Sequence, residues 1–477
     1  MRESHEEDGR FEDVSIGFVG GGSRDWASKM MTDLARQHTL EGEVRLYDVD
    51  QESAEQNARL GELIQDREEA IAEWDYRAVP SLVDALDGAD VVVLSTQDPP
   101  AETFAHDLDI PAEYGIYQSV GDTVGPGGTF RAMRAIPQYR EIAAAIREHC
   151  PDAWVLNYTN PMTVCTRTLY EEFPDIQAVG LCHEVLHVKD DLAEYVEKHR
   201  DIGNGQSISG DDLRVNVKGI NHFTWIDDVR FRGEDVFDVI DIELKAQQPL
   251  PGGFEPGDLD DETFYVNNDR IALDLYRRFG IFPAAGDRHL AEFVPWYLNL
   301  DDPKDVQRWG IRLTPSDHRI EHWPENERQR ERYLEGTEEF AFTDTGEKMV
   351  ELMTALLGGE ELVTNVNLPN RGQLSGVREG AIVETNALVT GDDIVPHAAG
   401  DLPEQARSMV RTHVSNQETL IEAGFTGDFD LAYQAFLNDP LVTLAPQDAR
   451  DLFADLVEAE RSYLTDWNLD EATVLEA

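Results

Sequence analysis

The sequence predicts an α/β protein, with a Rossmann-like, doubly wound parallel sheet followed by a C-terminal α+β domain. Three observations support this prediction. Short apolar runs alternate with helical patterns up to about residue 200, which is typical of parallel strands linked by helices. The run "ADVVVLST" has no polar alternation, as expected of a strand that is covered on both faces. A glycine turn, "GGGS", joins the first predicted strand to the first predicted helix.

Strands and helices are expected to alternate along the first part of the chain. The predicted strands cover residues 14–23, 43–50, 76–79, 89–96, 153–161 and 176–184. The predicted helices cover residues 25–37, 52–73 and 131–150, and Pro137 is expected to kink the last of them. This alternation implies a parallel sheet that is wound in both directions.

The pattern changes after a predicted loop at residues 203–212, "GNGQSISGDD". We therefore divide the chain into a Rossmann-like domain, residues 1–200, and a C-terminal α+β domain, residues 201–477, for substrate binding and oligomerisation. In the second domain, residues 213–233 alternate like antiparallel strands. The remaining predicted segments are helices at 267–275 and 325–357, strands near 367–389 and closing helices.

The charge of the chain is extreme. It has 40 Lys and Arg residues against 95 Asp and Glu residues, a net charge of −55 that is spread along all 477 residues. In dilute buffer such a surface repels itself, whereas molar salt shortens the Debye length to roughly 3 Å and screens the repulsion. We therefore expect a salt-adapted, halophilic protein, and the lack of a basic face argues against nucleic-acid binding.

Cysteine content and hydropathy concern the cellular compartment. The three cysteines, Cys150, Cys165 and Cys182, are too few for a disulfide framework and fit a reducing compartment. No apolar run approaches 18 residues, and the polar start "MRESHEEDGRFED" lacks the apolar segment of a secretory signal. The expectation is a cytoplasmic protein that does not act on a membrane.

The glycine turn is the first candidate site. Gly20 and Gly22 let the backbone approach a pyrophosphate, and the helix that follows offers unpaired N–H donors. Asp25 stands where the third glycine of the usual G-x-G-x-x-G pattern would be, so a plain structural turn is the alternative. Asp48 ends the second strand, where an acid binds ribose hydroxyls and repels the 2′-phosphate of NADP. The predicted cofactor is therefore NAD, and its predicted contacts are Gly20, Gly22, Ser23, Asp48 and Thr96.

Polar residues also gather where predicted strands end. Asn160, Cys182 and His222 each follow a strand, and ligands bind outside the carboxyl ends of parallel strands. Taken singly, each candidate has a plain structural interpretation. Cys182 is read as a small buried residue and His222 as a core imidazole, while Asp287 caps a turn and Arg131 lies on a solvated helix face. The residues alone lead only to an NAD-dependent enzyme whose site is undefined.

Several motifs in a fixed order resemble those of glycoside hydrolase family 4. The turn "GGGS" is similar to that family's nucleotide-binding turn, and "EYGIYQSVGDTVGPGGTFRAMR" to its long loop-and-helix signature. The segments "NYTNPM", "GLCHEV" and "GINHFTW" are similar to its substrate and metal segments, and "VNLPNRGQLSGV" to its C-terminal marker. Because these motifs span nearly the whole chain, chance is a poor explanation of their agreement.

The resemblance implies an unusual hydrolysis of an α-glycosidic bond. In this scheme NAD takes a hydride from C3 of the sugar, and the resulting ketone acidifies the proton on C2. A base removes that proton while a divalent metal, usually manganese, stabilises the enolate. The aglycone leaves by elimination, water adds at C1, and the first steps reverse, so that NAD is regenerated in each turnover.

The resemblance also implies roles for individual residues. Cys182, as a thiolate, and His222 are the implied protein ligands of the metal. Asp287 is the implied base at C2, and Tyr265 is the alternative because some family members use a tyrosine. His183 is implied to contact sugar hydroxyls or to protonate the leaving group. The implied substrate contacts are Asn160, Asn221, Arg131 and Arg288.

The motif "CHEV" is most similar to the α-galacturonidase group, so a small α-linked galacturonide is the expected substrate. Its C6 carboxylate needs a cation, and the candidates are Arg131, Arg134, Arg288 and Arg371. Glu184 would repel that carboxylate, so we expect it to point elsewhere or to pair with an arginine. Activity as an α-glucuronidase, α-galactosidase or α-glucosidase remains open, and the expected assembly is a homodimer or a homotetramer.

Two functions of other classes compete with this interpretation. A 2-hydroxy-acid dehydrogenase on the same fold would need no metal, and a non-catalytic NAD-binding sensor would not need Cys182, His222 and Asp287 together. Net NADH production from lactate or malate would favour the dehydrogenase. Binding of NAD without metal and without turnover would favour the sensor.

Overall fold

The structure is a computed structural model that describes residues 6–7, 10–24, 26–97, 101–202, 207–259, 265–343, 345–469, 472 and 474. The strands are β1 (Glu6–Glu7), β2 (Arg10–Val19), β3 (Leu40–Tyr47), β4 (Trp74–Ala78), β5 (Val91–Leu94), β6 (Trp154–Asn157), β7 (Gln177–Gly180), β8 (Leu213–Ile220), β9 (Phe223–Phe231), β10 (Glu234–Asp235), β11 (Phe282–Pro283), β12 (Leu362–Pro369), β13 (Ile382–Val389) and β14 (Ile394–Pro396). The α-helices are α1 (Trp26–Ala35), α2 (Gln51–Gln65), α3 (Leu82–Leu86), α4 (Ala101–Glu113), α5 (Gly125–His149), α6 (Met162–Glu172), α7 (Glu184–His199), α8 (Val239–Ala246), α9 (Arg270–Phe279), α10 (Asp287–Phe293), α11 (His318–Glu335), α12 (Met349–Leu356), α13 (Glu404–Thr426), α14 (Phe429–Leu437) and α15 (Pro446–Glu460). Short 3-10 helices lie at Gly210–Asp212, Pro295–Tyr297, Pro303–Trp309 and Arg461–Tyr463.

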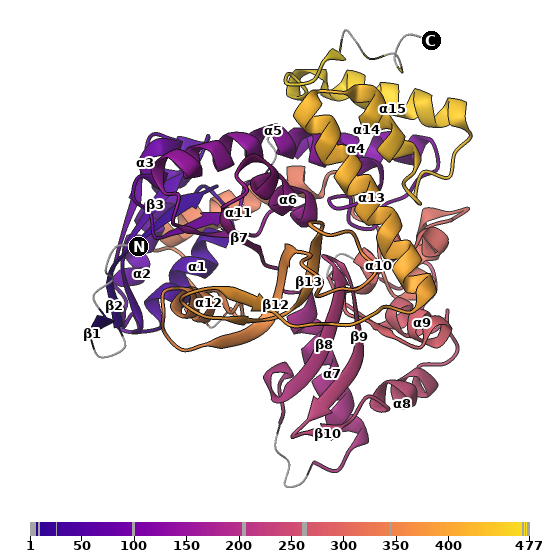
Figure 1. Ribbon diagram of the computed structural model, residues 1–477, viewed down its shortest axis with the longest axis horizontal. Coiled ribbons are helices and arrows are strands. Elements are labelled where there is room, and N and C mark those ends of the chain that lie inside the picture. Colours follow the sequence, from indigo (N-terminus) through magenta and orange to yellow (C-terminus); the bar gives the residue numbers. More distant parts are fainter. Residues whose placement is uncertain are drawn as a thin grey trace.

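The first half of the chain forms a parallel sheet. Its strands lie in the order β4-β3-β2-β5-β6-β7, and every neighbouring pair is parallel. The order reverses between β2 and β5, as it does at the switch point of a Rossmann fold. Helices α1 and α2 pack on one face, and α3, α5 and α6 pack on the other (Figure 1). The predicted doubly wound parallel sheet is therefore confirmed.

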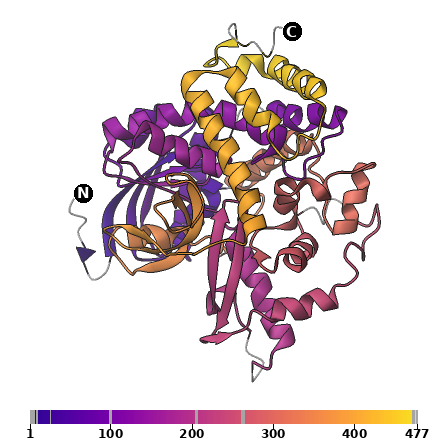
Figure 2. The ribbon, with the colours of Figure 1, turned by 45° about the vertical axis from the view of Figure 1, so that its right-hand side comes forward.

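The second half of the chain extends the same sheet with antiparallel strands. Strand β12 joins β7 through the single pair Asn367 and Gly180, and β13, β8, β9 and β10 follow in this order. Figure 2 shows the β8–β9 hairpin running away from the parallel sheet. Two of the hydrophobic cores contain residues from both sides of position 200. The division into two domains at residue 200 stays a prediction, since neither the sheet nor the core breaks there.

Some elements differ from the prediction in length. Helix α2 ends at Gln65, well before residue 73, and the Trp74 N–H donates to Gln65 Oε1 at 3.2 Å, which holds the start of β4 beside the helix end. The predicted helix at 325–357 is two helices, because Gly336 ends α11 in a left-handed conformation. Pro137 lies inside α5 without ending it. Residues 203–206 of the predicted loop lie outside the described part of the chain.

The closing helices α13, α14 and α15 return to the first half and pack near α4 and α5 (Figure 1). A buried ion-pair group lies at this contact. Arg134 of α5 binds Asp107 of α4, with an Nη2–Oδ2 distance of 2.7 Å, and also binds Glu460 of α15. Both carboxylates are fully buried. Arg134, a candidate cation for a substrate carboxylate, is therefore a structural residue. No helix in the described ranges is both long and apolar enough to cross a bilayer.

Replacement of Arg134 tests this interpretation. Arg134→Ala leaves two buried carboxylates without their cation, and we expect a loss of about 3–5 kcal/mol in the free energy of unfolding. Urea unfolding in molar KCl measures it. The matched control is Arg147→Ala on the same helix, whose side chain is 50% exposed in its ion pair with Glu172 and whose loss should stay below about 1 kcal/mol. Equal losses in the two variants would contradict the structural role.

Candidate active site

The glycine turn lies between β2 and α1, as predicted. Gly20 has a φ of +91°, and a Cβ atom there would lie 2.1 Å from the carbonyl oxygen of Ser95, so only glycine fits. Gly22 donates its N–H to Asp48 Oδ2 at 2.9 Å, and a side chain at Gly22 would collide with that carboxylate. The turn therefore brings a bare backbone, a helix N-terminus and an acid together, which is the arrangement that dinucleotide binding needs.

Ser23 and Thr96 are held by hydrogen bonds beside this turn. Ser23 Oγ accepts the N–H of Trp26, the first residue of α1, at 3.1 Å. The Thr96 N–H donates to Thr159 Oγ1 at 2.8 Å. Asp25, which stands at the third glycine position, lies outside the described residues. The roles of Ser23 and Thr96 as cofactor contacts stay predictions.

Helix α11 braces the glycine turn, and the sequence did not predict this contact. The buried Arg330 guanidinium donates to Asn57 Oδ1 at 2.9 Å and to Ser53 Oγ at 3.2 Å. Asn57 in turn donates to the carbonyl oxygens of Gly21 and Ser23, both at 2.8 Å. A helix from the second half of the chain thus fixes the backbone of the turn through two side chains.

The glycine turn meets the segment after β7 at Trp26. The Trp26 ring lies 4.8 Å from the ring of Tyr158 and 6.3 Å from that of His183, measured between centroids. Tyr158 follows β6 and His183 precedes α7. The carboxyl ends of three parallel strands therefore face one place, where a cofactor on the turn would lie near a ligand on the Cys182 segment.

Glu184 is the centre of a group of imidazoles. Its Oε2 accepts the N–H of Gly286 at 2.5 Å, and its Oε1 lies 4.0 Å from His183 Nε2 and 3.8 Å from His289 Nε2. Burial alone would raise the pKa of Glu184. The imidazoles of His289, His222 and His183 and the bond from Gly286 outweigh that effect and hold the pKa at about 2. Glu184 is therefore ionised, and these contacts are with imidazoles and a main-chain N–H rather than with the expected arginine.

His222 has a defined tautomer and no charge. It is buried at the turn between β8 and β9, and its Nδ1 lies 3.1 Å from Thr123 Oγ1, while Thr123 donates its hydroxyl to Asp122 Oδ1 at 2.7 Å. Because a hydroxyl has one hydrogen, Thr123 must accept the N–H of His222 Nδ1, which leaves the lone pair on Nε2. Burial, together with His289 stacked at 3.7 Å, lowers the pKa of His222 to about 3. The imidazole is therefore neutral, as a metal ligand must be.

Cys182 lies among carboxylates. Burial, Glu384 and Glu184 raise the pKa of its thiol well above the usual range. Glu184 also raises the pKa of His222, so the charge of one carboxylate affects both of the predicted metal ligands. A divalent cation would reverse the effect on the thiol, because its charge favours the thiolate. A thiol, a neutral imidazole and nearby carboxylates form a donor set that fits a divalent metal, although the role of the two ligands stays a prediction.

A second set of donors adjoins the first. Within the described ranges, His183, Glu184 and His187 offer ligand atoms that all lie within 4.8 Å of one another. These residues span the first turn of α7, where residues four apart share a face. Two of the three are neighbours of Cys182 in the sequence, so this set belongs to the same candidate site.

Buried amides mark the place of a polar ligand. Asn160 Oδ1, both polar side-chain atoms of Asn221, and His289 Nδ1 are buried without a hydrogen-bond partner. Asn221 nevertheless lies beside Cys182 and Glu384. Buried polar atoms are nearly always satisfied in folded proteins, so a group of them indicates a ligand with hydroxyls or charge. A sugar supplies such groups.

Two of the remaining predicted arginines are buried or half-buried. Arg131 Nε donates to the carbonyl oxygen of Asn160 at 2.8 Å, and only 4% of Arg131 is exposed, so its interpretation as a solvated helix arginine is wrong. Arg288 donates to the carbonyl oxygen of Ser119 at 2.7 Å, and burial lowers its pKa. Arg371 is exposed. Arg131 and Arg288 therefore remain the cations with the better case for binding a carboxylate.

Asp287 and Tyr265 lie in contrasting environments. Asp287 is fully buried, and its two oxygens accept the N–H groups of Arg270 at 2.6 Å and Ala272 at 2.9 Å, at the start of α9. Burial and Asp269 raise the pKa of Asp287 to about 7, against the effect of these N–H bonds. Tyr265 is 74% exposed. The role of Asp287 as a base stays a prediction.

The sequence analysis assigned no role to three residues of the site. Thr123 lies within the long loop motif, and His289 lies two residues after the predicted base Asp287, so both had a signal in the sequence. Glu384 had none, because it sits inside a strand of mostly apolar residues. Burial raises the pKa of Glu384 to about 7, although Asn365 donates to it at 2.7 Å.

Known proteins are similar to this chain over nearly its whole length. The model described as Family 4 glycosyl hydrolase matches residues 15–198, and that of the Family 4 glycosyl hydrolase C-terminal domain matches residues 217–442. The alpha-galacturonidase of Thermoanaerobacterium saccharolyticum is 44% identical over 97% of this chain and 99% of its own length. The alpha-galacturonidase of Bacillus subtilis is 42% identical over 94% and 97%.

Solved structures are also similar to this chain over most of its length. A crystal structure described as a putative glucosidase from Bacillus subtilis has a TM-score of 0.86 at 42% identity, covering 94% of this chain and 100% of that one. A 6-phospho-alpha-glucosidase from gut microorganisms, in complex with NAD and Mn2+, has a TM-score of 0.77 at 20% identity over 94% of this chain and 99% of its own, and shares the fold.

The hydrogen bond between Thr123 and His222 predicts a measurable effect on metal affinity. Thr123→Val removes the acceptor that fixes the His222 tautomer, and loss of such a partner typically weakens metal binding by about 10- to 100-fold. Titration of Mn(II), followed by the electron paramagnetic resonance of the free ion, measures the change. Thr123→Ser keeps the hydroxyl and is the matched control. If the Thr123→Val and Thr123→Ser variants bind Mn(II) equally well, the hydrogen bond from Thr123 does not prepare His222 Nε2 as a ligand.

Proposed function

The chain belongs to family 4 of the glycosyl hydrolases, and from this premise we propose that it hydrolyses the α-glycosidic bond of small galacturonides with NAD and a divalent metal, manganese by preference. The observation that carries the proposal is the meeting of the glycine turn with a thiol, a neutral imidazole and Glu184 at the carboxyl ends of the parallel strands. The α-galacturonidases that are 41–44% identical to this chain support the choice of sugar.

In the proposed chemistry, the cofactors supply the reactive groups and the protein positions them. When bound, NAD accepts a hydride from C3 of the sugar and the metal withdraws charge from the same region, so that C2 loses its proton more easily and the aglycone can be eliminated. The protein supplies position. Gly20 and Gly22 let the backbone of the turn pass close to Ser95 and Asp48. The turn would hold the pyrophosphate, and Asp48 would accept hydrogen bonds from ribose hydroxyls.

In this proposal Cys182 and His222 hold the metal. The Nδ1–H of His222 is donated to Thr123, which would leave the Nε2 lone pair free to hold the cation. A thiolate is a soft partner for a hard ion such as Mn(II), so we expect weak retention of the metal and sensitivity to oxidation. The charge of Glu184 acts on both residues, which favours a cation there.

The sugar would be held by amides and arginines. The unpaired polar atoms of Asn160 and Asn221 fit sugar hydroxyls, and Arg131 or Arg288 fits the C6 carboxylate. Burial lowers the pKa of His183 to about 4, although Glu184 opposes the shift. A neutral His183 at pH 7 suits a contact with sugar hydroxyls better than protonation of the leaving group.

The base at C2 is proposed to be Asp287, with Tyr265 as the alternative. A pKa of about 7 is suited to proton transfer near neutral pH, which supports Asp287. Its two main-chain bonds argue for a capping role instead. We also propose that the enzyme works in a salt-rich cytoplasm, on the basis of the charge of −55 and the free thiols.

A substrate panel tests the proposed function. We expect p-nitrophenyl α-galacturonide to be hydrolysed in molar KCl with manganese and NAD, at a rate above those of the α-glucuronide, the α-galactoside and the α-glucoside. In D2O the released sugar should carry deuterium at C2, because the proton removed there exchanges with solvent. Hydrolysis without this label would rule out the elimination route, and net NADH production from lactate or malate would favour a dehydrogenase.

The metal assignment has a separate test. Cys182→Ser should lose Mn(II) binding and activity while it keeps its affinity for NAD, because the thiol lies outside the glycine turn. Calorimetric titrations with Mn(II) and with NAD measure the two effects. Cys165→Ser, a buried cysteine of α6, is the matched control and should keep both. Full activity of Cys182→Ser would exclude Cys182 as a ligand.

A further inference from the structure

One face of helix α11 packs against the glycine turn. Trp323, Glu327 and Arg330 follow one another at intervals of four and three residues along α11, so they share a face of the helix. Arg330 braces the turn through Ser53 and Asn57. The other two residues of this face contact the side chain of an arginine in the turn itself.

That arginine is Arg24. Its guanidinium carbon lies 4.7 Å from the centre of the Trp323 ring. Its Nε donates to Glu327 Oε1 at 2.9 Å, and its Nη2 donates to the same oxygen. The Arg24 side chain is 25% exposed and that of Glu327 is 39% exposed, so solvent reaches both. Glu327 therefore neutralises a cation that the turn presents to the surface.

The charge of Arg24 acts on the acid that follows strand β3. Arg24 lies two residues after Gly22, whose N–H donates to Asp48 Oδ2 at 2.9 Å. Burial raises the pKa of Asp48, and Arg24 is among the groups that oppose this shift. Asp48 is the residue proposed to accept hydrogen bonds from the ribose. The Arg24 guanidinium therefore belongs to the part of the site where NAD has a 2′-hydroxyl and NADP has a 2′-phosphate.

An arginine and an acid in this place have opposite effects on the choice of cofactor. In this fold an acid binds the 2′-hydroxyl of NAD, whereas a nearby arginine accommodates the 2′-phosphate of NADP. This chain has both residues, Asp48 and Arg24. The Nε–H and Nη2–H groups of Arg24, which already donate to Glu327, are not available to a phosphate in that arrangement. The contact with Glu327 thus removes the residue that favours NADP.

We propose that Glu327 is a specificity-determining residue for the cofactor, which keeps Arg24 from binding the 2′-phosphate of NADP. Asp48 repels that phosphate directly, and Glu327 withholds the cation that would attract it. This inference rests on the proposed function, since it concerns the cofactor of that reaction. It assigns part of the preference for NAD to a helix from the second half of the chain.

The test is the affinity of the full-length protein for the two dinucleotides. Isothermal titration calorimetry at one fixed molar concentration of KCl, without a sugar substrate, gives the Kd for NAD and the Kd for NADP. Glu327→Gln keeps the shape of the side chain and removes its charge. We expect it to lower the ratio of the Kd for NADP to the Kd for NAD by roughly 10-fold, the usual weight of a charge-assisted hydrogen bond. Glu327→Ala, which removes the acceptor as well, should lower the ratio at least as much.

Two further variants separate the contact with Arg24 from a general effect of charge. Glu325→Gln removes the same charge from the same helix, but Glu325 pairs with Arg328 at 3.1 Å and with Arg332 at 3.2 Å, so it should leave the ratio unchanged. In an Arg24→Gln background, Glu327→Gln should not change the ratio, because no guanidinium is left to release.

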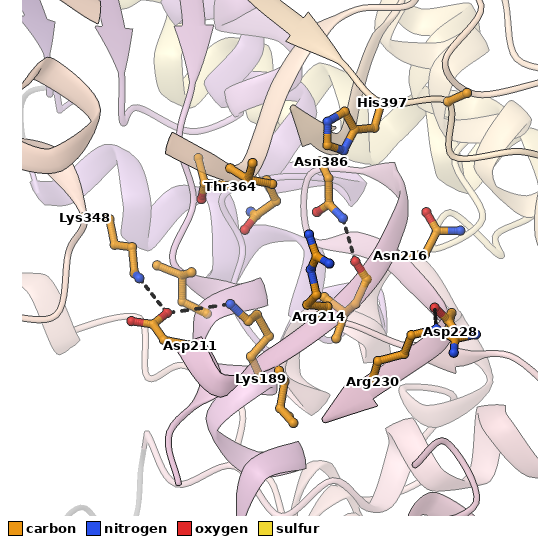
Figure 3. Close-up of a pocket in the computed structure, with 16 residues that line it drawn as sticks. Lys189, Asp211, Arg214, Asn216, Asp228, Arg230, Lys348, Thr364, Asn386 and His397 are labelled. Carbon is orange, nitrogen blue, oxygen red and sulfur yellow. Dashed lines mark hydrogen bonds and ion pairs between the residues drawn. The ribbon is translucent and has the colours of Figure 1, made fainter. Parts of the chain in front are cut away.

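A second cationic place on the molecule needs its own control. A cavity of about 640 Å³ between α7, the β8–β9 hairpin, β12 and β13 is lined by Lys189, Arg214, Arg230 and Lys348 (Figure 3). Arg214→Gln should leave the Kd for NADP unchanged, in the unmodified protein and in Glu327→Gln alike. A rise in that Kd would place the phosphate in this cavity and overturn the inference.

The contrary outcomes are distinct from one another. An unchanged ratio in Glu327→Gln and Glu327→Ala would overturn the inference, as would an equal fall in the Arg24→Gln background. If the unmodified protein binds neither dinucleotide, the proposed cofactor and this inference fail together. If the ratio shifts as expected but the unmodified protein hydrolyses no sugar of the substrate panel, the proposed function fails and the role of Glu327 stands.

Discussion

The join between β7 and β12 determines where the candidate site lies. Only Gly180 and Asn367 pair across it, and a Cβ atom at Gly180 would lie 2.9 Å from Thr166 Oγ1 and 3.0 Å from Asn367 Cβ. A larger residue at Gly180 would push the antiparallel strands away from the parallel ones. Two residues later the chain reaches Cys182, which the join brings beside Glu384 of β13. The thiol thus depends on one close approach between the two halves of the sheet.

Burial and neighbouring charges set the protonation of the side chains around that join. Ionised Glu184 lies among imidazoles, two of which are neutral because burial lowers their pKa. Without a cation, the thiol is held protonated by the same burial and the same carboxylates. The charge of a divalent ion would reverse this effect on the thiol.

Local patterns predicted the parallel strands, the glycine turn and the strand ends, because each depends on neighbours in the sequence. Known motifs then supplied Cys182 and His222. The sequence did not predict three long-range contacts. These are the contact of α11 with the glycine turn through Arg330, the effect of Glu384 on the Cys182 thiol, and the burial of Arg134 among carboxylates. Each of these joins residues far apart in the chain, and no local periodicity encodes which partner a charged side chain meets.

The unbroken sheet has a consequence for how ligands enter. A protein built from two lobes on a flexible connection opens its cleft by rotating one lobe against the other. Here backbone hydrogen bonds run from β4 to β10 and two hydrophobic cores cross the midpoint of the chain, so such a hinge is absent from the described part. Ligands would then enter and leave through movements of side chains and surface loops, while the Cys182 segment and the glycine turn keep their mutual geometry.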